Sequence, residues 1–350
     1  MDDDAAWRKP ALAVLDAYPF EVETLARVTQ GLVNLTVAVT ARDGARYALQ
    51  RLHPVFGPGV NANLDLVTAH LAGHGLLTPR LVRTRAGTLA VDAADGRWRV
   101  TTWVDGRAFD FLRDAAQAEA AGELLARFHA AAGDYAGPLL AERPPVHEFT
   151  RHRAHLATAL ETYTTHTLAP SVAAAADRLD ALRASHPHPA ATPPRLVHGD
   201  PKISNLLFDR TGTRALCMVD LDTLARMALP LELGDALRSW CNPRREDDPL
   251  ASFDLDLFSS ALSGYARGAR DFVRADEVEA LLPATLEIHL ELAARFLADA
   301  LEERYFGWDA ARYPTRGAHN LARAEGQLAA CASLAARYDQ AVTAVARAFA

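Results

Sequence analysis

Up to residue 104, the chain alternates apolar and polar side chains in short runs, which is the pattern of half-buried β-strands. Asp43-Gly44 separates two such runs and is a dipeptide typical of tight hairpins. One stretch in this region instead repeats apolar residues at helical spacing. The predicted elements are strands at 35–40 and 46–51, a helix at 61–72, and a second hairpin from 88 to 104 that turns at 94–96.

The pattern changes after Asp105-Gly106, where Ala-rich stretches carry apolar residues at helical intervals. A proline-rich loop at 185–194 interrupts them, because proline breaks helices and restricts the residue before it. Short β-like runs follow at 195–197, 206–208 and 215–219. Helices are predicted at 115–132, 149–165, 171–185, 252–270, 285–304 and 318–349.

The strand pattern of the first part and the helical pattern of the second predict an α+β fold with two lobes, an outline that resembles a kinase. Residues 1–104 would form a small β-rich N-terminal lobe with one helix, and residues 105–350 a large, mainly helical C-terminal lobe. A chain of 350 residues is long enough for two cores of ordinary size. Its balance of 50% hydrophobic and 23% charged residues is typical of a folded globular protein.

The charge and cysteine content exclude several classes of partner and compartment. A net charge of -7 provides no general basic surface, so neither nucleic acid nor a membrane is expected as a partner. The cysteines are far apart and number 3, which suits a reducing compartment rather than a disulfide framework. The acidic start, Met1-Asp2-Asp3-Asp4, differs from a signal peptide, and no apolar run is long enough to span a bilayer. A cytoplasmic protein is expected.

The most informative polar residues lie between Leu196 and Phe208. Phosphoryl transfer needs an oriented hydroxyl nucleophile, neutralised phosphate charge and fixed metal ions. Asp200 can orient that hydroxyl and accept its proton, and Lys202 can reach the γ-phosphate. Asn205 supplies a carbonyl oxygen, which is a hard ligand suited to Mg²⁺.

A second group of acids ends the apolar run at 215–219, in the order Asp220-Leu-Asp222. Carboxylates at the end of a buried strand are costly without a partner, and a divalent cation is the obvious one. Strand alternation puts Asp222 on the same side as Asp220, so it would share the metal or hold the groups that bind it. Each feature alone is compatible with an ordinary turn or cap, but together they predict a kinase that uses ATP and Mg²⁺.

Other chemistries lack their residue patterns. The 13 histidines are scattered, and the pairs His152/His155 and His186/His188 have no cysteine or carboxylate at a zinc-like spacing. The sequence contains neither the G-x-S-x-G of a serine hydrolase nor the GxxxxGK[ST] of a Walker-type ATPase. A zinc enzyme, a hydrolase and a P-loop ATPase are therefore not expected.

The segments 198–205 and 219–220 resemble the catalytic loop and the metal-binding strand end of the aminoglycoside phosphotransferase and choline kinase superfamily. That superfamily is a branch of the protein-kinase-like fold. The resemblance implies Asp200 as the catalytic base, and Asn205 and Asp220 as ligands of Mg²⁺.

Lys202 departs from the antibiotic-resistance members, which usually have a histidine nearby, and looks more like a protein kinase loop. The segment 233–238 is similar to the Gly-Asp segment that opens a helix in the superfamily. A closer resemblance, to the N-acetylhexosamine 1-kinases, covers nearly the whole chain. It is carried by residues 47–51, 200–205, 215–223, 295–301 with 305–306, and 320–323 with 327–328.

The N-acetylhexosamine 1-kinases phosphorylate the anomeric hydroxyl of N-acetylglucosamine or N-acetylgalactosamine. The resemblance therefore implies a small-molecule acceptor, an amino sugar or N-acetylhexosamine. Arg238 and Arg295 are the candidates to bind its oxygens beside Asp200, because guanidinium groups suit such contacts. The alternatives are an aminoglycoside or amino-alcohol kinase, a kinase for another sugar, and a nucleotide-binding regulator without turnover. The oligomeric state and the choice between ATP and GTP are not predicted.

The residues expected to bind the nucleotide are Gly31, Asn34, Gln50, Arg51 and Val104. Gly31 and Asn34 lie where a phosphate-covering loop belongs, although no GxGxxG is present. Gln50 occupies the third-strand position that is lysine in many kinases, with Arg51 beside it. Strand alternation sends these two to opposite faces, so only one can face the phosphates. Val104 lies where the adenine edge would meet the backbone, by analogy alone.

Overall fold

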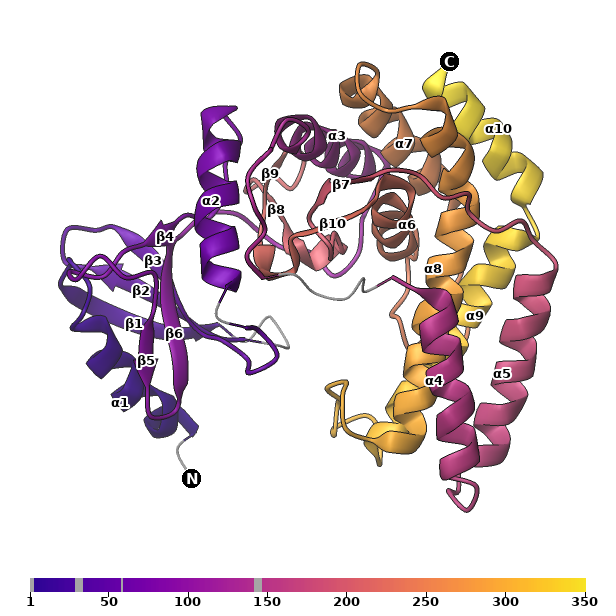
Figure 1. The fold of residues 1–350 in the computed structure, drawn as a ribbon, viewed down its shortest axis with the longest axis horizontal. Coiled ribbons are helices and arrows are strands. Elements are labelled where there is room, and N and C mark those ends of the chain that lie inside the picture. Colours follow the sequence, from indigo (N-terminus) through magenta and orange to yellow (C-terminus); the bar gives the residue numbers. More distant parts are fainter. Residues whose placement is uncertain (1–2, 29–33, 58, 142–146) are drawn as a thin grey trace. The chain divides into compact units, whose positions relative to one another are not determined.

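The computed structural model describes residues 3–28, 34–57, 59–141 and 147–350 (Figure 1). The chain forms two compact units. The N-terminal unit comprises Met1–Asp105, Asp134–Glu142 and Val219–Leu224. The C-terminal unit comprises Gly106–Gly133, Arg143–Met218 and Ala225–Ala350. The functional division of the chain between residues 104 and 105 stays a prediction.

The N-terminal unit is built on an antiparallel sheet in the order β1-β2-β3-β6-β4, and β5 also pairs with β6. The short 3₁₀ turn η2 (Leu221–Thr223) also belongs to this unit. Its other elements are α1 (Asp3–Leu15), β1 (Val22–Val28), β2 (Leu35–Ala41), β3 (Arg46–Arg51), α2 (Val60–Gly73), β4 (Leu81–Val82), β5 (Val91–Ala93) and β6 (Gly96–Thr102).

One face of this sheet packs against α1 and forms the hydrophobic core of the unit. Trp98 and Val100 of β6 lie in that core together with Trp7 of α1. Arg99 falls between them in the sequence and is also buried. Because successive side chains of a strand point to opposite faces, Arg99 lies on the other side of the sheet. A buried guanidinium needs polar partners, and those partners belong to the candidate site.

The C-terminal unit is mainly helical, and the long helix α8 is buried along most of its 28 residues. Two small sheets, β7 with β10 and β8 with β9, flank the turn η1. The helices are α3 (Ala115–Ala132), α4 (Phe149–Thr162), α5 (Ala169–Ala184), α6 (Leu229–Trp240), α7 (Leu255–Ala269), α8 (Ala275–Glu302), α9 (Arg316–Ala335) and α10 (Tyr338–Phe349). The strands are β7 (Pro194–Val197), β8 (Leu206–Phe208), β9 (Ala215–Met218) and β10 (Ala225–Ala228), with η1 at Ile203–Asn205.

The α+β class is confirmed, and several elements match their predicted bounds. The predicted helix at 115–132 coincides with α3, and the predicted strand at 46–51 coincides with β3. The predicted helix at 61–72 corresponds to α2, and the second hairpin is formed by β5 and β6. No helix in the described ranges is both long enough and apolar enough to cross a membrane.

Other boundaries were wrong for identifiable reasons. Helix α8 begins ten residues before the predicted start at 285, because Pro283 lies inside it without ending it. The predicted helix at 318–349 is two helices, α9 and α10, and its Ala-rich sequence holds no glycine or proline at the break. Helix α1 was not predicted. Like α8, it contains an internal proline, Pro10, that does not end it.

Helices α3 and α7 cross so closely that glycine is required on both. A Cβ atom at Gly122 of α3 would lie 2.0 Å from the carbonyl oxygen of Ala261. A Cβ atom at Gly264 of α7 would lie 2.0 Å from the carbonyl oxygen of Glu119. Since backbone atoms cannot rotate away as side-chain ends do, the helices would have to separate to admit a methyl group.

We therefore expect Gly122→Ala to lower the free energy of unfolding by about 1–3 kcal/mol, the usual cost of overpacking. Gly73→Ala is the matched control, because nothing lies within 4 Å of a Cβ atom at that helical position. It should be neutral or stabilise the protein by up to about 1 kcal/mol through helix propensity. Urea unfolding measures both variants, and equal midpoints would contradict the close crossing.

Candidate active site

The loop between β7 and β8 brings the three predicted catalytic side chains together. The Asp200 carboxylate oxygen Oδ2 accepts hydrogen bonds from Lys202 Nζ at 2.5 Å and from Asn205 Nδ2 at 3.1 Å. Asn205 Nδ2 also donates to the backbone oxygen of Asp200 at 2.8 Å, which closes the loop on itself. With its nitrogen engaged, the amide carbonyl oxygen of Asn205 is the atom left to coordinate a cation.

Helix α6 fixes the backbone of this loop through a buried acid that the sequence reasoning missed. Glu232 is fully buried, and its two carboxylate oxygens accept hydrogen bonds from the N–H groups of His198 (2.9 Å) and Gly199 (3.0 Å). Gly199 has a φ of 84°, which favours glycine there. Trp240 Nε1 donates to the carbonyl oxygen of Pro201 at 2.9 Å. The sequence signal that could have identified Glu232 is its position as the single acid among the apolar residues that begin α6.

Arg238 lies on α6 and forms an ion pair with Asp235 at 2.8 Å. Burial raises the pKa of Asp235. The positive charges of Arg238, His147 and Lys202 lower this pKa by more than burial raises it, so the net shift is downward. Burial lowers the pKa of Arg238, and Asp235, Glu246 and Asp200 outweigh that effect. Arg238 Nε and Nη2 donate hydrogen bonds to Asp235 Oδ1 at 2.9 and 2.8 Å, and the charges of Asp200 and Lys202 contribute to the pKa shifts of this pair.

Arg295 lies on α8, where it pairs with Glu291 at 3.8 Å and lies over the ring of Phe306. Glu291 is buried, and its Oε1 atom also lies 3.1 Å from Nδ1 of His147. Burial lowers the pKa of His147, but the hydrogen bond and charge of Glu291 raise it overall. Glu291 was not singled out from the sequence, because a single acid on a long helix usually faces solvent.

In the N-terminal unit, Arg99 is the centre of a buried polar network. Its Nη1 and Nη2 atoms donate to the two carboxylate oxygens of Asp222 at 2.5 and 2.9 Å. Gln50 Oε1 accepts from Arg99 Nε and Nη2, and Asn61 Oδ1 accepts from Arg99 Nη1 at 3.2 Å. Asn34 Nδ2 donates to Asp222 Oδ2 at 2.9 Å. We call these five residues the Arg99 network.

The Arg99 network shows which of the two neighbouring third-strand side chains lies on the face of Asp222. Gln50 pairs directly with Arg99 in the register of β3 and β6, so both point to the same face. Arg51 turns away, to an ion pair with Asp95 at 3.1 Å and to the ring of Trp98. The cation on the Gln50 face is therefore Arg99, which no local pattern marked.

Asp220 belongs to the N-terminal unit and has left-handed backbone angles, with φ 63° and ψ 49°. Such a conformation is uncommon outside glycine and concentrates at functional sites. Asp220 precedes η2 without capping it through its side chain. Val104 follows β6 and is half-buried, whereas Gly31 lies outside the described residues. The predicted residues that the structure describes therefore form two groups, one in each unit.

The phosphotransferase enzyme family matches residues 24–270 of the chain. A homoserine kinase from Beijerinckia indica subsp. indica is 29% identical over 218 residues, which is 61% of this chain and 61% of that protein. The structure is similar to an aminoglycoside phosphotransferase from Alicyclobacillus acidocaldarius, with a TM-score of 0.62, 18% identity, and coverage of 95% and 96%.

It is also similar to an amicoumacin kinase in complex with AMP-PNP and Ca²⁺, with a TM-score of 0.60 and 16% identity. This second likeness covers 94% of this chain and 93% of that chain. At such low identities the two solved structures show the fold alone. They confirm the predicted fold class, a small sheet-based N-terminal part followed by a mainly helical remainder.

One prediction concerns His289 of α8, whose Nδ1 atom lies 2.9 Å from Gln327 Oε1. Burial, with a contribution from Arg238, lowers the pKa of His289 from 6.5 to about 3. Below pH 6.5, His289 binds a proton in the unfolded chain but not in the folded chain. The contribution of His289 to the free energy of unfolding is therefore fully present above pH 6.5 and is lost as the pH falls. Between pH 7.5 and 5.5 the loss from one such group is about 1.4 kcal/mol.

His289→Gln removes the titrating group, so its free energy of unfolding should fall less over this interval, by about that amount. Chemical denaturation at the two pH values measures the difference. His188→Gln is the control, since its side chain is 51% exposed and should leave the decline unchanged. The same decline in His289→Gln and in the wild type would contradict the buried neutral imidazole.

Proposed function

This chain belongs to the phosphotransferase enzyme family, and on that basis we propose that it transfers the γ-phosphoryl group of ATP to a hydroxyl group of a small polar molecule. The observation that carries the proposal is the convergence of Asp200, Lys202 and Asn205 on one loop. The hydroxyl oxygen forms the new bond to phosphorus, the bond from the γ-phosphorus to the bridging oxygen breaks, and ADP leaves. Asp200 takes the hydroxyl proton.

Each residue of the loop has a distinct part in this proposal. Asp200 orients the acceptor hydroxyl, and Lys202, which already lies against that carboxylate, offsets charge on the transferred group. Asn205 and Asp220 would hold Mg²⁺ through hard oxygen atoms. Bound Mg²⁺ would neutralise phosphate charge. Their donor set fits this ion, because an amide carbonyl and a carboxylate are ligands that it prefers.

Asp222 is better suited to positioning than to direct metal binding. Both of its oxygens accept hydrogen bonds from Arg99, and one also accepts from Asn34. We assign it the role of holding the segment that carries Asp220. Arg99 then supplies the positive charge on the nucleotide face of the sheet, beside Gln50.

The charges near the catalytic loop favour a neutral or zwitterionic acceptor. Asp235 is balanced by Arg238, and Glu291 is balanced by His147 and Arg295. A polycationic aminoglycoside would need a surplus of acids, and these pairs provide none. Of the two predicted acceptors, an N-acetylhexosamine is neutral, whereas a free amino sugar carries an ammonium group. We therefore propose an N-acetylhexosamine first and an amino sugar second, phosphorylated at the anomeric hydroxyl, and the sequence resemblance supports the same choice.

A second candidate is an amino alcohol. The relative that is 29% identical is a homoserine kinase, and paired charges would also suit the ammonium and carboxylate of a zwitterion. Both candidates use the same loop chemistry and differ only in the acceptor, so a direct screen separates them.

The test is ADP release from Mg²⁺-ATP with N-acetylglucosamine, N-acetylgalactosamine, glucosamine, glucose, homoserine, choline and kanamycin as acceptors. We expect turnover with an N-acetylhexosamine or amino sugar. Turnover of homoserine or choline without any sugar would replace the first candidate with the second. ATP binding with no turnover on any acceptor would favour a silent regulator and contradict the proposal.

Asp200→Asn is the control for the chemical step. It should lower kcat by about 10²–10⁴-fold, because the amide cannot take the proton, while nucleotide binding persists. Near-normal turnover in this variant would remove Asp200 from the proposed role.

A further prediction concerns Arg99→Lys, which keeps the charge but loses the forked contacts to Asp222 and Gln50. The loss of about 1–2 kcal/mol of positioning should raise the KM for ATP about tenfold and leave the KM for the acceptor unchanged. Arg51→Lys is the matched control on the opposite face and should leave both constants unchanged. If Arg51→Lys had the larger effect on ATP, Arg51 would be the nucleotide-facing cation.

A further inference from the structure

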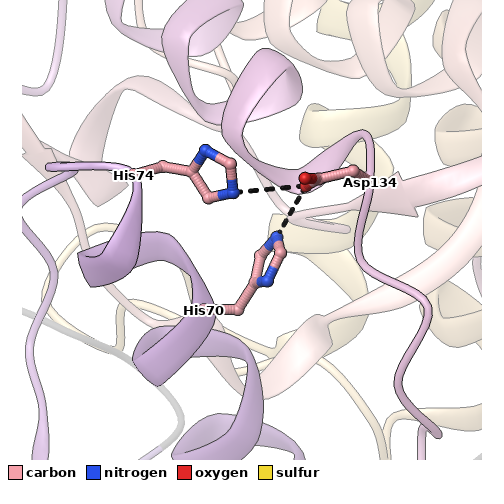
Figure 2. Close-up of side chains that lie close together, drawn as sticks. All are labelled: His70, His74 and Asp134. Carbon is pink, nitrogen blue, oxygen red and sulfur yellow. Dashed lines mark hydrogen bonds and ion pairs between the residues drawn. The ribbon is translucent and has the colours of Figure 1, made fainter.

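Two histidines at the end of α2 converge on one carboxylate (Figure 2). His70 lies in the last turn of α2, and His74, four residues later, is the residue that caps it, so the two lie about one helical turn apart on the same side. His70 Nε2 lies 2.9 Å from Asp134 Oδ1, and His74 Nε2 lies 3.3 Å from the same oxygen. All three residues belong to the N-terminal unit.

These separations fit the first coordination sphere of a zinc ion. With Zn–N and Zn–O bonds of about 2.0–2.2 Å, two ligands of a tetrahedral ion lie about 3.3–3.5 Å apart. The three candidate ligand atoms lie within 4.8 Å of one another, and the two N–O separations are already 2.9 and 3.3 Å. Shifts of about 1.5 Å or less would complete the set. All three side chains reach solvent, so an ion can enter.

The segment that begins with Asp134 also contacts α2 at its C-terminal end, near Leu140 and Ala141. Asn63 Oδ1 accepts hydrogen bonds from the N–H groups of Leu140 (2.5 Å) and Ala141 (3.3 Å). Gly59 lies so close that a Cβ atom would be 2.7 Å from the carbonyl oxygen of Leu140. We call Asp134–Ala141 the α2 strap. Because the strap is fixed at one end by backbone contacts, the His-Asp end is positioned before any ion arrives.

The ring of Tyr135 further restrains this end. It meets the His70 imidazole edge-on, with ring centroids 5.2 Å apart. Its hydroxyl donates to the carbonyl oxygen of Pro138 at 3.1 Å. An imidazole whose rotation is restricted loses less entropy when it binds a metal, so Tyr135 contributes to preorganisation.

We propose that His70, His74 and Asp134 bind one divalent transition-metal ion, with Zn²⁺ preferred, and leave a fourth position to water. Two imidazole nitrogens and a carboxylate oxygen are borderline-soft and hard donors that suit Zn²⁺, whereas Mg²⁺ prefers oxygen ligands alone. The ion would fasten the α2 strap to the end of α2. The inference is independent of the proposed phosphotransfer.

The experiment uses the full chain without a histidine tag, stripped of metal with EDTA and dialysed. Zn²⁺ is titrated in competition with a chromophoric chelator, and Co²⁺ is used to record the visible absorption of a four-coordinate site. We expect one ion per chain and a rise in the unfolding temperature that grows with free Zn²⁺. Millimolar Mg²⁺ should not displace it.

The decisive variant is His70→Gln/His74→Gln. Glutamine can still donate hydrogen bonds to Asp134, so a site that only clamps by hydrogen bonding would survive, while Zn²⁺ affinity should fall at least about 100-fold. His186→Ala/His188→Ala is the matched control, a surface pair that should bind Zn²⁺ as the wild type does. No saturable Zn²⁺ binding by the wild type, or equal affinity in the glutamine variant, would overturn the proposal.

Discussion

The geometry of the N-terminal unit around η2 depends on the ion pair between Arg99 and Asp222, whose side chains are only 2% and 0% exposed. Removing two such charges from water costs several kcal/mol each, and the attraction between them compensates only when the remaining polar atoms are also satisfied. Gln50, Asn61 and Asn34 provide that satisfaction. The pair therefore contributes little net stability, and its consequence is geometric, because it fixes the segment around η2.

The C-terminal unit also contains a buried carboxylate, but backbone N–H groups rather than a guanidinium satisfy it. Glu232 is a fully buried carboxylate whose partners are two backbone N–H groups, those of His198 and Gly199. In each unit, a buried acid immobilises a short segment that bears a half-buried acid. Asp200 and Asp220 are the half-buried acids, and the buried acids that hold their segments are Glu232 and Asp222. Phosphoryl transfer depends mainly on positioning, so this arrangement matches its requirements.

The sequence predicted what is encoded locally. Helical periodicity located α2 and α3, and residues within six positions of one another sufficed to find Asp200, Lys202 and Asn205. Partners distant in sequence were not predictable. Arg99 and Asp222 are 123 positions apart, and the carboxylate that meets the histidines of α2 comes from beyond α3. The sequence analysis tested histidines for metal binding by local spacing alone, so it did not consider His70, His74 and Asp134 together. Helix α8 passes through Pro283, so a local breaker rule placed its start too late.

The position of Arg99 illustrates why a charge expected on one strand can come from its neighbour. In antiparallel pairing, residues directly opposite on neighbouring strands point to the same face, so a side chain of β6 can supply a charge to the face of β3. Gln50 and Arg99 are such a pair. The longer guanidinium then reaches Asp222 while Gln50 becomes its acceptor. An absent lysine at position 50 is therefore no argument against nucleotide binding, since the residue opposite it on β6 is an arginine and points to the same face.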